Sequence, residues 1–210
     1  MDIYLDQFKS HWLRFSSQLS IEQDISQTLL NILITAYSEP QRAYHNVQHI
    51  AECLAHFQSI QSSLNDPIAV ETAIWFHDVI YEPKASDNEL QSAELMKQLC
   101  NTFLSEQQIE KVYQWIIATQ KHQSSYDHDL NSLLDIDLAI LGSNAERFAQ
   151  YQQQIQFEYA WVESDVYQVK RKQVLQQFEQ MNPIFQTSYF NQRLEKQAKR
   201  NLADSMSVLI

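Results

Sequence analysis

The stretch PIAVETAIWFHDVI, residues 67–80, is the most apolar segment of helical pattern in the chain, and the polar pair His77-Asp78 lies near its end. Asp66 is a favourable N-cap residue and Pro67 suits the first helical position. The stretch therefore predicts a central helix. A histidine alone in such a stripe is typically a hydrogen-bonded core residue. An uncompensated buried carboxylate is costly, however, so Asp78 favours a metal ion bound by the pair.

The composition favours an all-α protein. One Gly and four Pro in 210 residues leave little material for the turns of β-hairpins. No change in composition marks a linker, so we expect one helical domain over residues 1–210, with a core around residues 42–142 and the terminal helices closing the bundle. Apolar spacing and start signals predict helices at 3–15, 21–37, 45–57, 67–80, 86–100, 105–120, 130–141, 143–162, 165–180 and 189–206. Capping boxes are expected at 20–23, 86–89 and 105–108.

Charge and hydropathy limit the class of partner. The formal net charge of -11 disfavours a nucleic-acid polymer, whereas a small phosphorylated substrate stays compatible with a local cationic pocket. The chain has no apolar run of about 18 residues and no signal-peptide pattern at its start, which predicts a cytoplasmic protein without a membrane segment. Cys53 and Cys100 lack metal-finger spacing, so both are expected to be buried thiols without a disulfide.

A second polar group is YHNVQH, residues 44–49. His45 and His49 are four residues apart, so on a helix they would share a face with Cβ atoms roughly 5–6 Å apart. This spacing suits two metal ligands, or one ligand and a catalytic neighbour. Taken alone this spacing is weak evidence for a functional site, because pairs of surface histidines at this interval are common.

The third polar group is Asp135-Ile136-Asp137. Two residues span about 200° of a helix, so both carboxylates cannot face one site from regular backbone. Asp137 has the more apolar neighbours, and we expect it to be the buried carboxylate that needs a partner. Asp135 is expected beside a ligand or exposed. Gly142 follows where a helix end favours a residue with positive φ.

Together the three groups supply imidazoles and carboxylates, a donor set that suits Mn, Mg, Zn or Fe. Their order resembles the His…His-Asp…Asp signature of the HD superfamily of metal-dependent phosphohydrolases, which are all-helical. The resemblance implies that the metal ligands are His49, His77, Asp78 and Asp137 and that His45 is the general acid. The segment YHNVQH is similar to the corresponding motif of cyclic nucleotide phosphodiesterases, and Ile136-Asp137-Leu138 to their final ligand motif.

A closer resemblance covers almost the full chain. The chain looks like a family of small bacterial predicted HD phosphohydrolases, on the residues Arg42 to His49, Trp75 to Asp78, Asn88-Glu89, Ser92-Ala93, Thr119, His122, Asp135 to Gly142, Glu195, Ala198 and Asn201-Leu202. This family has a predicted phosphohydrolase activity without an assigned substrate. We expect a divalent ion, one or two per chain, and a small phosphate ester as substrate, a nucleotide or a related phosphomonoester or diester.

Further candidates flank the three groups. Arg42 and Lys84 lie beside the first two and are candidates to bind phosphate, although such side chains are usually solvated. Two-metal members of the superfamily add two histidines between the His-Asp pair and the last Asp. Here His122 and His128 lie six residues apart in one polar loop. We favour His122 as the additional ligand, and an exposed loop histidine is the alternative for either.

The main hypothesis is hydrolysis of a phosphoester by a metal-activated water. In this hypothesis His45 donates a proton to the leaving oxygen, and Asp78 binds one metal ion or bridges two. One alternative is a di-iron oxygenase, which needs both additional histidines. Another is a non-catalytic module with a structural metal, in which aromatic C-terminal helices bind a partner or form a homodimer. The aromatic residues concerned are Tyr151, Phe157, Tyr159, Trp161, Tyr167, Phe178, Phe185, Tyr189 and Phe190.

Overall fold

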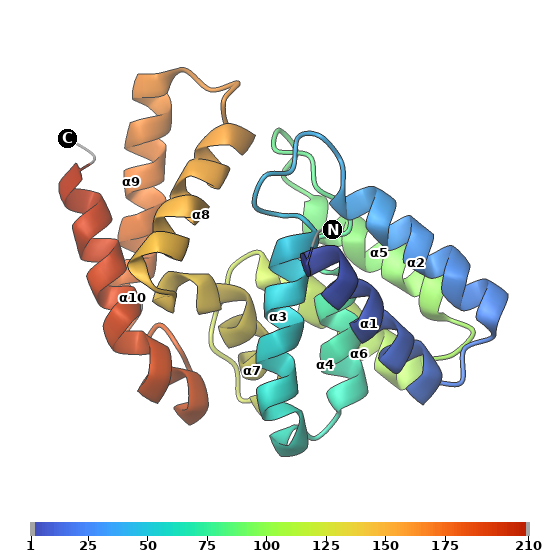
Figure 1. Cartoon of the computed structure of the whole chain (residues 1–210). Coiled ribbons are helices and arrows are strands. Elements are labelled where there is room, and N and C mark those ends of the chain that lie inside the picture. Colours follow the sequence, from blue (N-terminus) through green and yellow to red (C-terminus); the bar gives the residue numbers. More distant parts are fainter. Residues whose placement is uncertain (1–2, 209–210) are drawn as a thin grey trace. The chain divides into compact units, whose positions relative to one another are not determined.

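The computed structural model describes residues 3–208, which form ten α-helices and no β-strand (Figure 1). The predicted all-α class is confirmed for this part of the chain. The chain divides into two compact units, residues 1–133 and 134–210, and the division falls inside α7 (His128–Asp137). The single domain expected over residues 1–210 stays a prediction, and its residues 1, 2, 209 and 210 lie outside the described part.

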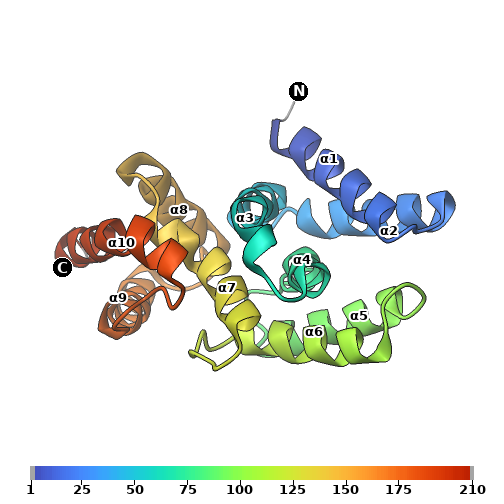
Figure 2. The same ribbon diagram turned by 90° about the horizontal axis from the view of Figure 1, so that it is seen from below.

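The first unit is built around α4 (Pro67–Phe76), in which every residue from Ala69 to Phe76 is buried. Asp66 accepts a hydrogen bond from the backbone N–H of Ala69 at 3.1 Å, which is the predicted helix start. Figure 2 shows α4 between α3 and the α5–α6 pair. The helices around it are α1 (Ile3–Gln18), α2 (Gln23–Tyr37), α3 (Val47–Ile60), α5 (Asn88–Cys100) and α6 (Glu106–Thr119).

An aromatic cluster fixes the C-terminal end of α4. The Trp75 ring meets Phe8 and Trp12 edge-on, with centroids 4.8 and 5.3 Å away. The Tyr37 hydroxyl donates to the Trp75 carbonyl oxygen at 2.9 Å. Burial raises the pKa of Tyr37, so this hydroxyl stays protonated and keeps its role as donor. α1 and α2 thus hold the backbone that leads into His77.

The second unit contains α8 (Ala145–Glu158), α9 (Ser164–Gln180) and α10 (Ser188–Val208), preceded by a short 3-10 helix at Leu138–Gly142. The positive φ predicted for Gly142 is wrong. A Cβ at Gly142 would lie 2.5 Å from Leu194 Cβ, so glycine is needed there because α10 approaches closely. Asn201 supports the same contact by donating to the carbonyl oxygens of Leu141 and Ser143, both at 2.8 Å.

Two of the three predicted capping boxes are wrong. Ser105 forms one with Gln108 at the start of α6. Ser20 instead has φ 54°, and the backbone there closes the end of α1, with Ile21 N–H donating to Ser16 O at 3.0 Å. α5 begins after Asp87, whose side chain makes no cap hydrogen bond.

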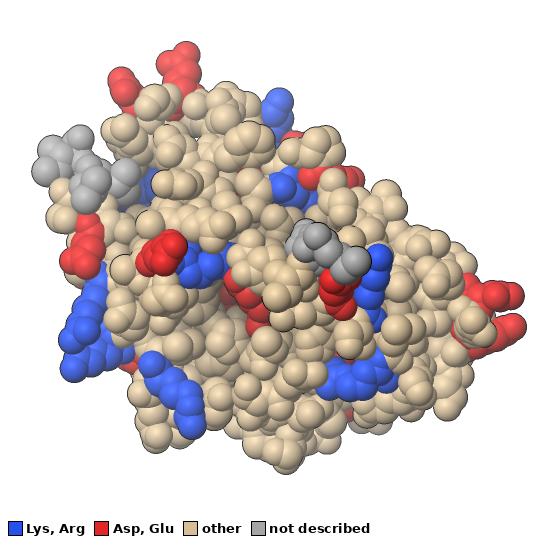
Figure 3. All heavy atoms as spheres, viewed as in Figure 1, with Lys and Arg blue, Asp and Glu red and all other residues tan. Residues whose placement is uncertain are grey.

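The remaining global predictions concern the cysteines and the surface. Cys53 and Cys100 are buried thiols outside any disulfide, as predicted. Within residues 3–208 no helix combines the length and apolarity that a membrane span requires. On the face shown in Figure 3, Lys and Arg side chains are interspersed with Asp and Glu and form no continuous basic surface.

Candidate metal centre

The ends of two helices bring His49, His77 and Asp78 together. His49 lies in the first turn of α3, and His77 and Asp78 directly follow the last residue of α4. The prediction that His77 and Asp78 lie within a helix ending at residue 80 is therefore wrong. The helix that was predicted to include His45 starts only at Val47, so His45 and His49 are not related by helical spacing.

Three potential ligand atoms form a nearly equilateral triangle. His49 Nε2 lies 3.2 Å from His77 Nε2 and 3.5 Å from Asp78 Oδ2, and His77 Nε2 lies 3.1 Å from the same carboxylate oxygen. Both imidazoles are buried, and the Asp78 side chain is 18% exposed. These residues, all in the first unit, could hold a metal ion.

The size of the triangle fits one ion. Metal–ligand bonds of about 2.1 Å place adjacent ligand atoms about 3.0 Å apart at a right angle and about 3.4 Å apart at the tetrahedral angle. Two of the observed separations, 3.1 and 3.2 Å, lie in this interval, and the third, 3.5 Å, is just above it. The donors are two nitrogens and one oxygen, which suits Mn, Mg, Zn or Fe.

The tautomer of His77 supports a role as ligand. Its Nδ1 lies 3.0 Å from the Ile74 carbonyl oxygen, which can only accept, so Nδ1 carries the proton. In the neutral ring Nε2 then presents a lone pair toward His49 and Asp78. Such a hydrogen bond from the second ring nitrogen to a carbonyl is the usual support of a metal-bound histidine. The His77 Nε2 lone pair and the Asp78 carboxylate oxygen, 3.1 Å apart, need a proton or a cation between them.

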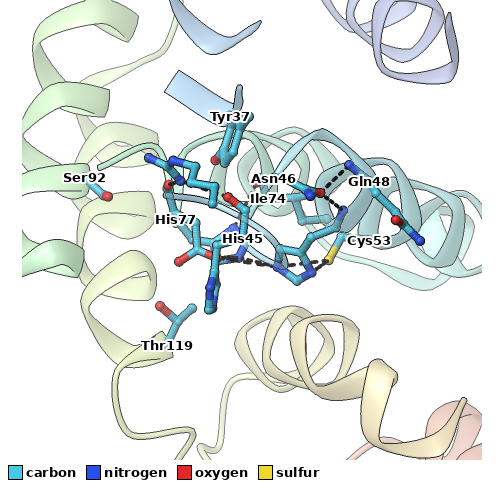
Figure 4. A network of polar contacts seen from close by, with 12 residues as sticks. Tyr37, His45, Asn46, Gln48, Cys53, Ile74, His77, Ser92 and Thr119 are labelled. Carbon is cyan, nitrogen blue, oxygen red and sulfur yellow. Dashed lines mark hydrogen bonds and ion pairs between the residues drawn. The ribbon is translucent and has the colours of Figure 1, made fainter. Parts of the chain in front are cut away.

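Asn46 and Tyr44, which had no role deducible from the sequence, position His49. The Asn46 side chain caps α3 by accepting from the backbone N–H groups of Gln48 and His49 at 2.9 and 3.4 Å, and it donates to Ala43 O at 2.7 Å. The Tyr44 ring packs against that of His49, with centroids 4.8 Å apart. Figure 4 shows Asn46 at the start of the helix that carries this histidine.

Arg42 ties the segment before α3 to the segment after α4. Its guanidinium donates to the carbonyl oxygens of His45, Asp78 and Val79 at 3.1, 2.6 and 2.9 Å. The side chain is 0% exposed and forms an ion pair with Glu39 at 2.9 Å. Its predicted contact with phosphate stays a prediction, whereas its hydrogen bonds give it a definite structural role.

His45 lies beside the triangle (Figure 4). Its ring stacks on Tyr81 at a centroid distance of 4.2 Å and meets the Tyr44 ring edge-on at 5.0 Å. The His45 and His49 centroids are 6.1 Å apart. Two aromatic neighbours thus restrict the orientation of the His45 ring near His49.

Cys53 and Ser92 support this site by contacts that were not predicted from the sequence. Cys53 Sγ, one turn after His49 on α3, lies 3.7 Å from His49 Nδ1. Buried Ser92 of α5 accepts from Ile80 N–H at 3.0 Å and donates to Ile80 O at 3.3 Å, which fixes the segment after Asp78. The spacing of His49 and Cys53 could have indicated the first contact. No local pattern indicates the second.

Three other candidates are Lys84, His122 and Asp135. Lys84 is exposed in the loop before α5. His122 follows α6 with φ 48°, and within residues 3–208 it belongs to no group of three potential ligands. Asp135 is buried in the second unit and accepts from the backbone N–H groups of Gln186 and Thr187 at 2.8 and 2.7 Å and from the Thr187 hydroxyl at 2.6 Å.

Asp137 is the last residue of α7 and is half-buried. The prediction that Asp137 is the more buried carboxylate of the pair is wrong, because Asp135 is only 1% exposed. Burial raises the pKa of Asp135, and the hydrogen bonds from Thr187 and Gln186 oppose this rise. Because Asp137 belongs to the second unit, its role as a ligand rests on the sequence resemblance.

Comparisons with known proteins add no relative: no family model, no curated protein and no solved structure matches the chain.

Proposed function

We propose that the chain is a metal-dependent phosphohydrolase of the HD type that acts on a small phosphate ester, a nucleotide or a related phosphomonoester or diester. The observation that supports this proposal is the triangle of His49, His77 and Asp78, with the imidazole of His45 beside it. A nitrogen–oxygen ligand set and an adjacent general acid are what metal-assisted hydrolysis of a phosphate ester needs.

His49, His77 and Asp78 would hold the ion, and Asp137 is proposed as a further ligand because of its place in the sequence motif. When bound, a divalent ion of this kind lowers the pKa of a coordinated water and neutralises charge on phosphoryl oxygens. The proposal includes Mn, Mg, Zn or Fe, one or two ions per chain, with His122 as the additional ligand in the two-metal case.

His45 would donate the proton that the leaving oxygen needs. Its contacts with Tyr81 and Tyr44 hold the ring in one orientation, and Arg42 holds the His45 and Asp78 carbonyl oxygens on one guanidinium. The proton donor and a metal ligand are thereby kept at a constant separation, which is the geometric requirement of general acid catalysis. Exposed Lys84 is proposed to attract the phosphate group.

A screen of phosphate esters with each of the four metals tests the proposal. Wild type is expected to release phosphate from at least one ester. His77→Asn keeps a donor for Ile74 O but removes the Nε2 ligand atom, so it should lose metal and turnover. His56→Asn changes a histidine of the same helix as His49 outside the ligand group and should retain both. Full turnover in His77→Asn, or none in wild type with any metal, would contradict the proposal.

Two exposed aromatic side chains favour a second candidate, a metal-stabilised interaction module. Phe157 and Trp161, in the second unit, are 60% and 52% exposed. Exposed large apolar side chains are typical of surfaces that bind a partner or a second copy. Tight self-association in sedimentation, weakened by Trp161→Ser, together with no turnover of any ester would favour this candidate over the enzyme.

A further inference from the structure

A cavity of about 400 Å³ lies in the second unit between α8, α9 and α10. Phe148, Ala149 and Gln152 of α8 form one wall, and Tyr167 and Arg171 of α9 form another. This volume is within the range of cavities that bind small molecules, about 300–1,000 Å³. All lining residues belong to residues 145–205, so the cavity shares no residue with the His49, His77 and Asp78 group.

The wall contains a buried charge with uncharged partners. Arg171 is 8% exposed. Its Nε and Nη2 both donate to Gln152 Oε1, at 2.9 and 2.5 Å, and its guanidinium lies 5.0 Å from the centroid of the Tyr151 ring. Among residues 3–208, no acidic side chain forms an ion pair with Arg171. A buried guanidinium usually has a carboxylate partner, because desolvation of a charge is costly.

We propose that this cavity binds a small molecule with a carboxylate or phosphate head group and an apolar part. The head group pairs with Arg171, because a guanidinium presents its N–H donors in a fork that fits two oxygens of such an anion. The apolar part lies against Phe148 and Ala149. The ligand supplies the negative charge that the surrounding helices do not give to Arg171.

Because the chain is acidic, binding of an anion in this cavity depends on the positive charge of Arg171. With a net charge of -11 the protein repels anions in general, so an anion is retained only where a cationic side chain compensates. The cavity is also lined by Asp204, which is exposed on α10. Asp204→Asn should therefore leave binding of an anion unchanged or tighten it, whereas Arg171→Gln should weaken it.

Titrations followed by NMR of the full chain test the proposal with three probes. Benzoate and phenyl phosphate share a ring and differ in the head group, and benzyl alcohol is a neutral analogue. One or both anions should shift signals of α8 and α9, and the preferred anion identifies the head group. Arg171→Gln should weaken this binding by about ten-fold or more. Lys170→Gln removes the same charge from an exposed position of the same helix and should bind as wild type does.

Three results would overturn the proposal: no shift of α8 and α9 signals with either anion, equal affinity for benzyl alcohol and benzoate, or wild-type affinity in Arg171→Gln. If Arg171→Gln does not fold, Ala149→Phe provides the test. Ala149 is exposed at the cavity wall, so a phenyl ring there fills the cavity and leaves Arg171 intact. It should abolish binding, and binding at wild-type affinity would overturn the proposal equally.

Discussion

His45 is the residue whose chemistry distinguishes catalysis from simple metal binding. In His45→Asn, turnover of an alkyl phosphate ester should fall about 100- to 10,000-fold, the usual range for loss of a general acid, while the metal content stays unchanged. With p-nitrophenyl phosphate the loss should be much smaller, because nitrophenolate leaves without a proton. Steady-state kinetics with both esters decides the question. Equal losses with the two esters would contradict the proton-donor role.

Glu71 on α4 gives a second prediction for a single residue. Its carboxylate pairs with Arg14 at 2.6 Å, yet burial outweighs this partner and raises the pKa from 4.5 to about 7. The folded state therefore keeps a proton that the unfolded state releases above pH 4.5. The stabilisation that the protonated form provides is complete below about pH 4.5 and is lost as pH rises from about 4.5 to 7. It amounts to about 3 kcal/mol.

Urea unfolding of wild type and Glu71→Gln at pH 5 and pH 8 measures this effect. Because Gln does not titrate, the wild-type stability minus that of Glu71→Gln should be lower at pH 8 than at pH 5. A difference that is the same at both pH values would show that Glu71 has an ordinary pKa.

The burial of the His77 side chain was easier to predict from the sequence than the backbone structure around it. The apolar neighbours of His77 indicated a buried imidazole, and it is buried. That His77 follows the end of α4 was not predictable, because Arg42, which is 36 residues from Asp78 in sequence, binds the Asp78 and Val79 carbonyl oxygens. A local pattern contains no information about such a partner.

At the scale of elements, the start of α3 sets the position of His49. Asn46→Ala removes the side-chain acceptor for two N–H groups and should lower the free energy of unfolding by about 0.5–2 kcal/mol. It should also weaken metal binding, because the first turn of α3 carries His49. Asn46→Ser retains a capping oxygen and should recover most of the stability. Equal stability of Asn46→Ala and wild type in urea would exclude this role.

Local start signals were reliable only where no tertiary contact competed. Ser105 caps α6 as expected, and Asn144 caps α8 one residue after the predicted start at residue 143. Ser20 instead completes the end of α1. At the start of α5, Asn88 Oδ1 accepts from Glu82 N–H at 3.0 Å, and the Ser86 carbonyl oxygen accepts from the Gln120 side chain at 3.1 Å. These partners lie outside the four-residue pattern and determine which residue begins the helix.

At the scale of the whole molecule, metal should stabilise particular segments. Hydrogen exchange with and without Mn is expected to show added protection at the start of α3 and around His77 and Asp78, because a ligand that binds only the folded state stabilises it. If Asp137 is a ligand, as the sequence resemblance implies, the end of α7 gains protection as well. Unchanged exchange around Asp137 would remove it from the ligand set.

The all-α class followed from composition, because one Gly in 210 residues cannot support a set of hairpins. The division into two compact units did not follow, since the boundary lies inside α7, where neither a linker nor a change in composition marks it. The Arg171 cavity was equally unpredictable, because residues from three helices line it.

The proposed function depends on the binding of one metal ion by His49, His77 and Asp78. A crystal structure of protein grown with Mn, with diffraction measured at energies above and below the Mn absorption edge, tests it most directly. We expect an anomalous peak bonded to His49 Nε2, His77 Nε2 and the Asp78 carboxylate, at distances of about 2.0–2.3 Å. A Mn-loaded crystal with no peak among these three side chains would contradict this metal site.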